Sequence, residues 1–109
     1  MLEPLLGSKT AENVLTFILS RENGYASEIA RFFRVGVYGI QCQLEKFERG
    51  GVLISKSVGK TRVYELNPRY AFRDQLTSLL MKAIDFYPEE EKDRLLVYRQ
   101  RPRRKGKTL

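Results

Sequence analysis

Apolar residues recur at steps of three and four residues in several stretches of the chain, which is the spacing of one buried face on an α-helix. This spacing is found at 9–21, 26–33, 37–49 and 72–86. A further helix is expected from Pro88, because proline suits the first turn of a helix and the glutamates after it suit the positive end. The pattern therefore predicts five helices, the first with Ser8 as its N-cap.

Between the third and fourth of these stretches the pattern changes to that of a β-hairpin. Residues 52–58 are predicted to form one strand and residues 61–66 the other, with successive side chains on opposite faces. Gly59 and Lys60 supply the turn between them. Tyr25, just before the second helix, is expected to form a one-residue strand.

The stretch 37–49 is amphipathic. At 100° per residue, Ile40, Leu44 and Phe47 fall within about 60° of one another and form the buried stripe, with Val37 beside it. The opposite side carries groups that can form hydrogen bonds: Tyr38, Cys42, Glu45 and Arg49, with Gln41 and Lys46 at its edges.

The connection at 34–36 joins two helices in a tight turn, in which Val35 is expected to be the buried apolar plug. Helices in this arrangement, followed by a basic hairpin, make a winged helix-turn-helix. We therefore expect an α+β chain that is mostly α. It would be a winged helix-turn-helix with an N-terminal helix before it and C-terminal dimerisation helices after it.

The chain has 109 residues, which suits one domain, and 42% of them are apolar, enough for one small core. Its net charge of +7 is concentrated at one end, because residues 99–109 hold six basic residues and no acidic one. The remainder is nearly neutral. The basic segment either binds a polyanion such as nucleic acid or is a flexible, solvated tail.

The composition argues against several classes of protein. Cys42 is the only cysteine and there is no histidine, so neither an intramolecular disulfide nor a Cys/His metal cage is expected, and no cofactor is predicted. The chain contains no nucleophile–base constellation and no Gly-rich phosphate loop, so we do not expect an enzyme. Cys42 is either a small unreactive side chain or a redox-sensitive thiol.

A location in the cytoplasm, away from the membrane, is also expected. No apolar run approaches the ~20 residues that a bilayer span requires, and the first residues lack the pattern of a signal peptide. The single cysteine fits a reducing compartment.

Four segments of the chain resemble known regulators. They are Tyr-Ala-Ser-Glu-Ile-Ala at 25–30, the helix segment 40–44, Glu-Arg-Gly-Gly-Val-Leu at 48–53 and Val-Gly-Lys-Thr-Arg-Val-Tyr-Glu-Leu-Asn-Pro at 58–68. Together they are similar to ArsR/MarR-type winged helix-turn-helix transcriptional regulators, over roughly residues 8–86. The resemblance implies sequence-specific binding of double-stranded DNA by a homodimer. Residues 1–98 would be the winged-helix DNA-binding domain and residues 99–109 the basic tail.

The resemblance also assigns roles to residues. The helix 37–49 would enter the major groove, and the hairpin, or wing, at 52–66 would lie on the flanking backbone or in the minor groove. DNA base readout would fall to Tyr38, Gln41, Cys42 and Glu45. Contacts to the DNA backbone, which set position rather than sequence, would fall to Arg34, Lys46, Arg49, Lys56, Lys60 and Arg62.

Apolar residues outside the helix-turn-helix are candidates for a contact between two chains. The predicted dimerisation residues are Phe17, Phe72, Leu76, Leu79, Leu80 and Leu95. The same side chains could instead fill the core or line a ligand pocket.

The chain departs from the regulator pattern in the turn and on the recognition helix. Such turns usually carry glycine where Arg34 stands and serine or threonine where Gly36 stands. Gly39 and Cys42 leave the outer face of the helix with few long donors, which would limit direct base readout. A second interpretation is also open, favoured by the nearly neutral folded part and by Glu45 on the outer face of the helix: a winged-helix protein-interaction module that docks on a larger enzyme or nucleoprotein assembly.

Overall fold

The computed structural model describes residues 1–100, with side chains described as far as residue 96. Its elements are α1 (Glu3–Leu6), α2 (Lys9–Arg21), α3 (Ala26–Phe33), α4 (Val37–Arg49), β1 (Leu53–Val58), β2 (Thr61–Leu66), α5 (Arg73–Asp85) and α6 (Glu89–Gln100). The mostly helical winged helix-turn-helix is confirmed, and the predicted helices and strands are found within about one residue of their expected ends. The short helix α1 was not predicted. The predicted boundary after residue 98 falls inside α6, and residues 101–109 of the predicted tail lie outside the described residues.

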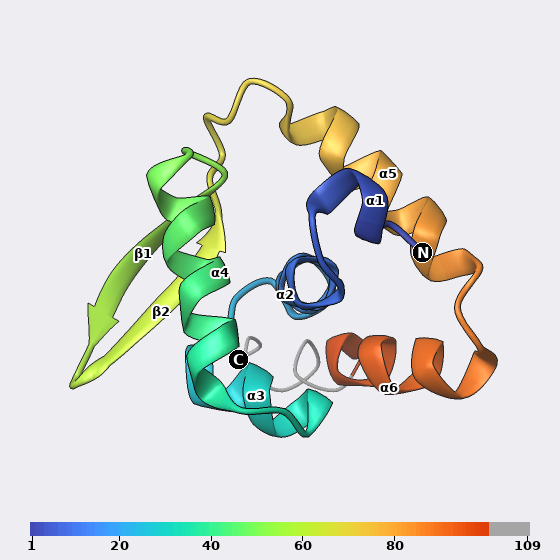
Figure 1. Ribbon diagram of the computed structural model, residues 1–109, viewed down its shortest axis with the longest axis horizontal. Coiled ribbons are helices and arrows are strands. Elements are labelled where there is room, and N and C mark those ends of the chain that lie inside the picture. The colour runs from blue at the N-terminus through green and yellow to red at the C-terminus, as the bar shows by residue number, and fades with distance from the viewer. Residues whose placement is uncertain (101–109) are drawn as a thin grey trace.

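Helix α2 is the centre of the molecule, with other elements on every side of it (Figure 1). It begins at Ser8, whose Oγ accepts a hydrogen bond from the Ala11 amide at 3.1 Å, as predicted for an N-cap. The sequence predicted one buried face, but Glu12, Thr16 and Ser20 are buried as well. The physical reason is that α5 and α6 return to cover the side of α2 that the helix-turn-helix leaves open.

The wing is an antiparallel hairpin in which Leu53 pairs with Leu66 and Val58 with Thr61. Its base is fixed to the helix-turn-helix by two backbone hydrogen bonds between Gly24 and Tyr64, of 3.0 and 2.8 Å. The one-residue strand therefore lies at Gly24, not at Tyr25 as predicted. This bridge sets the position of the hairpin beside α4.

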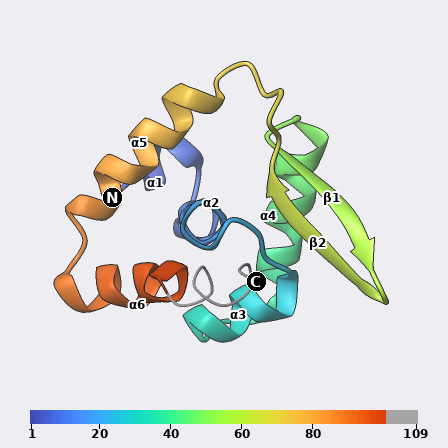
Figure 2. The ribbon, with the colours of Figure 1, turned by 180° about the vertical axis from the view of Figure 1, so that it is seen from behind.

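Helices α5 and α6 lie on the side of α2 opposite the wing (Figure 2). Leu95, on the inner side of α6, is fully buried. The guanidinium of Arg94 stacks on the Phe32 ring at 4.1 Å and donates to the Phe32 carbonyl oxygen at 2.7 Å. Arg21 lies 4.9 Å from the same ring and donates to the Arg94 carbonyl oxygen at 3.3 Å. These contacts tie α6 to α3 and to the end of α2.

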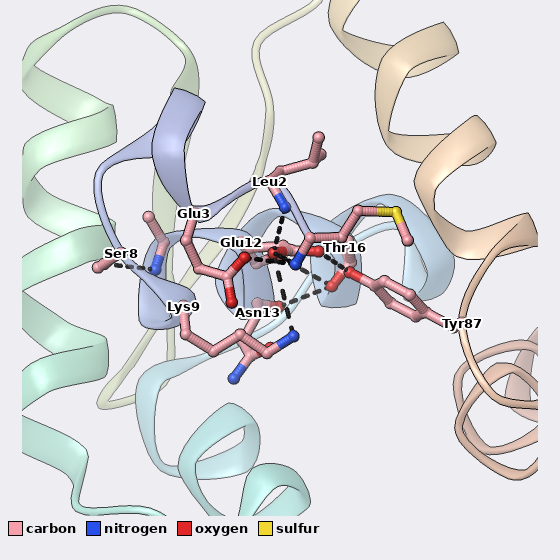
Figure 3. Close-up of polar contacts among 10 residues, drawn as sticks. Leu2, Glu3, Ser8, Lys9, Glu12, Asn13, Thr16 and Tyr87 are labelled. Atoms are coloured by element: carbon pink, nitrogen blue, oxygen red, sulfur yellow. Dashed lines mark hydrogen bonds and ion pairs between the residues drawn. The ribbon is translucent and has the colours of Figure 1, made fainter.

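A buried carboxylate joins three parts of the chain (Figure 3). Glu12 has no exposed surface and accepts hydrogen bonds from the Leu2 amide at 2.9 Å, the Met1 amino group at 3.2 Å and the Tyr87 hydroxyl. Burial alone would raise the pKa of Glu12, but these donors outweigh it and the pKa lies below its usual value. The carboxylate of Glu12 therefore links α2 to the start of the chain and to the α5–α6 connection.

Candidate nucleic-acid interface

Helix α4 presents the face that the sequence predicted. Ile40, Leu44 and Phe47 are buried, as predicted for the inner stripe. The four residues predicted to read bases are all exposed on the other side: Tyr38, Gln41, Cys42 and Glu45. The structure thus brings the predicted base-readout residues together on one free helix surface.

The turn before α4 is closed by the backbone and not by an apolar plug. Arg34 takes the left-handed conformation, with φ of 59°, and the Val35 amide donates to the Ala30 carbonyl oxygen at 3.0 Å. Val35 is 49% exposed, so its predicted burial is wrong, and Val37, predicted beside the buried stripe, is 44% exposed. The left-handed backbone explains why glycine is usual at the position of Arg34.

Two candidate base-readout residues interact with each other. Hydrogen bonding to the Cys42 thiol raises the pKa of the Tyr38 phenol, one helical turn away. Cys42 is exposed and forms no disulfide.

The predicted DNA-backbone residues lie around α4 and along the wing. Arg34, Arg49, Lys56, Lys60 and Arg62 are exposed, as polyanion contacts require.

Lys46 is also exposed, but its ammonium lies over the Phe47 ring, 5.9 Å from the ring centroid. It also lies 3.8 Å from the position that a Cβ on Gly7 would take. It therefore reaches along α4 toward the junction of α1 and α2.

The wing and α4 are connected through polar side chains. Arg62 donates from Nη1 to the Ser55 Oγ at 2.9 Å, and Ser55 donates to the Glu48 Oε2 at 2.6 Å. Glu48 belongs to the last turn of α4, so the chain of contacts runs from α4 through β1 to β2. Sequence reasoning missed Glu48 and Ser55, since nothing in their spacing marks them as partners.

The predicted dimerisation residues divide into two groups. Phe17, Leu80 and Leu95 have no exposed surface, so we assign them to the core, where they have no area left for a second chain to cover. Leu76 is half-buried against that core.

The other two predicted dimerisation residues lie at the surface: Phe72, directly before α5, is 62% exposed, and Leu79, on α5, is 37% exposed. Phe86, which is 65% exposed, was not among the predicted residues. The signal for it was a step of seven residues from Phe72 through Leu79 to Phe86, which returns to nearly the same side of a helix.

The described residues contain no group of three or more His, Cys, Asp or Glu side chains placed to hold a metal ion. Within the same part of the chain, no helix is long and apolar enough to cross a bilayer.

Comparison with known proteins adds a likeness of fold. No protein family model matches the chain, and no curated protein matches it. Among solved structures, Lactococcus lactis ZitR, described as a zinc-responsive MarR family member, is similar at 17% identity and a TM-score of 0.47, over 93% of this chain and 75% of that one.

A mutant of ZitR in apo form is similar at 9% identity and a TM-score of 0.48, covering 91% of this chain and 83% of the other. A further structure of the mutant gives 11% identity and a TM-score of 0.48, covering 91% and 75%. At these values the comparison assigns neither a family nor a ligand to this chain.

Proposed function

We propose that this chain is a cytoplasmic transcriptional regulator that binds duplex DNA in a sequence-specific manner as a homodimer. Helix α4 enters the major groove, and the wing lies on the flanking backbone or in the minor groove. The observation that carries the proposal is the exposed polar face of α4, with the base-readout candidates on it and exposed cations in the turn and along the wing.

The geometry suits this role for physical reasons. A helix fits the major groove, and the first residues of a recognition helix reach the base edges. Gln41 is exposed on that part of α4, and glutamine pairs with adenine through two hydrogen bonds. Arg34, Lys56 and Lys60 are exposed at the turn and the wing, where they would meet phosphates.

The homodimer is proposed to form through α5. Leu79 lies exposed on this helix, and Phe72 and Phe86 lie exposed directly before and after it. A second chain would remove the surface of these three large apolar side chains from water. Two copies of α4 would then lie about one DNA turn apart, ~34–36 Å, and bind a pseudo-palindrome.

A fluorescence-anisotropy titration with duplex DNA at several salt concentrations tests the DNA-binding part. Affinity should fall steeply with salt, because each phosphate contact releases counterions. Replacing both Lys60 and Arg62 by alanine should weaken binding to all sequences and flatten the salt dependence. Gln41→Ala should instead change the preference between sequences. An anisotropy that stays flat with every duplex at low salt would disprove DNA binding.

Light scattering on the full-length chain tests the dimer separately. A dimer mass that falls to a monomer mass in Leu79→Asp would support the α5 interface. Thr61→Asp is the matched control, because Thr61 is an exposed residue of the wing, on the side of α2 opposite α5 (Figure 2). This variant should remain dimeric. A wild-type protein that is monomeric at the concentrations used for binding would refute the homodimer.

The interaction-module alternative is favoured by one observation: Glu45 lies exposed on the outer face of α4, where a carboxylate repels phosphate. Replacing Arg103, Arg104 and Lys105 by glutamine in the full-length chain separates the two functions. Sequence-specific binding that survives supports the regulator. If the wild type binds DNA only weakly and without sequence preference, and the variant does not bind, the module is the better assignment.

A further inference from the structure

We propose that the start of α4 recognises the methyl groups of thymine, so that the protein selects A·T base pairs in the major groove. This inference rests on the proposed DNA binding and names the base pairs that the same surface would choose. Its starting point is the unexpected exposure of the apolar residues beside the helix-turn-helix turn.

Three apolar side chains lie exposed within four residues of one another. Val35 is 49% exposed, Val37 is 44% exposed and Tyr38 is 78% exposed. Single exposed apolar residues are ordinary, but these three gather where a recognition helix begins. The first turn of such a helix is the part that reaches the base edges.

Two glycines leave room around these side chains. Apart from the adjoining residues and the nearby backbone of α4 itself, no atom of the described residues lies within 4 Å of the position that a Cβ would take on Gly36 or Gly39. Neither glycine takes a left-handed conformation, so the backbone does not require glycine at either position. Bare backbone at the start of α4 permits a base edge to approach closely.

The chemical groups that base pairs display in the major groove then indicate which base pairs this surface would bind. The thymine methyl is the one apolar group that base pairs display in the major groove, and guanine is read chiefly by arginine or lysine. Residues 37–45 contain neither arginine nor lysine. They do contain Gln41, whose amide matches adenine. Methyl contacts and the glutamine therefore both favour A·T pairs.

The surroundings favour DNA over an apolar protein surface as the occupant. Arg31 and Arg34 are exposed at the end of α3 and in the turn, directly before the apolar residues in the chain. A duplex offers both partners at once, with phosphates for the guanidinium groups and methyl groups for the valines.

The test begins with sites selected from random duplex DNA by the full-length protein. Each thymine of a selected site is then replaced by deoxyuridine, which removes the methyl group and keeps every hydrogen-bonding group. Loss of one contacted methyl should weaken binding about four-fold, the value of one buried methylene-sized group. Val37→Ala should bind the thymine and deoxyuridine duplexes with more nearly equal affinity.

Val58→Ala is the matched control, because Val58 is 55% exposed at the tip of the wing and far from the turn in the chain. It should keep the full preference for thymine. If the wild type binds selected duplexes but binds thymine and deoxyuridine versions equally, or selects G·C-rich sites, the methyl readout is wrong while the proposed function stands. If it binds no duplex, the proposed function fails first.

Discussion

Replacing Tyr87 by phenylalanine should destabilise the fold by about 2 kcal/mol, although the change removes a single oxygen atom. The hydroxyl donates to the carboxylate of Glu12, which has no exposed surface. Buried hydrogen bonds to a charged group contribute about 1.5–3 kcal/mol each. For a domain of this size, a loss of 2 kcal/mol lowers the melting temperature by roughly 10 °C.

Urea unfolding followed by circular dichroism measures this change. Tyr38→Phe is the matched control, since it removes the same atom from a side chain that is 78% exposed, and it should change stability by no more than about 0.5 kcal/mol. Glu12→Ala should cost more than Tyr87→Phe, about 3–5 kcal/mol, because it leaves several buried donors without an acceptor. If Tyr87→Phe unfolds at the wild-type urea midpoint, the reasoning about this buried contact is wrong.

The same contact predicts a dependence on pH. The pKa of Glu12 in the folded chain lies below its ordinary value of 4.5, so its stabilisation is complete above that pH. It is lost as the pH falls through the lowered, folded-state pKa. The difference in unfolding free energy between the wild type and Glu12→Gln should therefore shrink below about pH 4.5. A difference that stays constant down to acid unfolding would contradict the assigned charge.

Three further changes have expected outcomes. Arg34→Gly should raise the unfolding free energy measured in urea by about 0.5–1 kcal/mol, because glycine adopts the left-handed backbone without strain. It should also weaken DNA binding measured by fluorescence anisotropy. A lower unfolding free energy would contradict this reasoning. Gly39→Ala should likewise stabilise α4 by about 0.5–1 kcal/mol but impair DNA binding, and unimpaired binding would argue against close approach of a base there. Ser55→Ala should break the link from Glu48 to Arg62 and speed amide exchange in the wing. Arg62→Ala should then change the unfolding free energy less in that variant than in the wild type; fully additive effects would disprove the link.

The order of elements could be predicted because each has a local signature. Apolar residues spaced three and four positions apart indicated the helices, and Gly59-Lys60 between two strand-like stretches indicated the wing. The inner stripe of α4 was predicted for the same reason, since its burial follows from helical geometry alone. Those signals lie within one element and need no knowledge of its neighbours.

Sequence reasoning was incomplete or wrong where distant parts of the chain decide the outcome. For Phe17 the sequence left a dimer contact and the core both open, and in the structure its ring packs against Phe32 and Phe33 of α3, with centroids 5.3 and 6.3 Å away. Val35 was predicted to be buried, yet a backbone hydrogen bond closes the turn without it. The role of Glu12 depends on Tyr87, which is 75 residues later in the chain. Contacts between residues so far apart in the chain cannot be predicted from the sequence pattern of a single element.

Gly24 limits which substitutions the chain can accept at position 24 and at the residues packed against it. A Cβ added there would lie 2.9 Å from the Phe17 Cε1 and 3.3 Å from the Ile29 Cδ1, closer than ordinary contacts allow. Even alanine would therefore force the aromatic cluster to move, while the bridge to Tyr64 prevents the backbone from retreating. Among related chains we expect this position to vary only together with Phe17, so that a larger residue at 24 is accompanied by a smaller ring or an aliphatic side chain at 17.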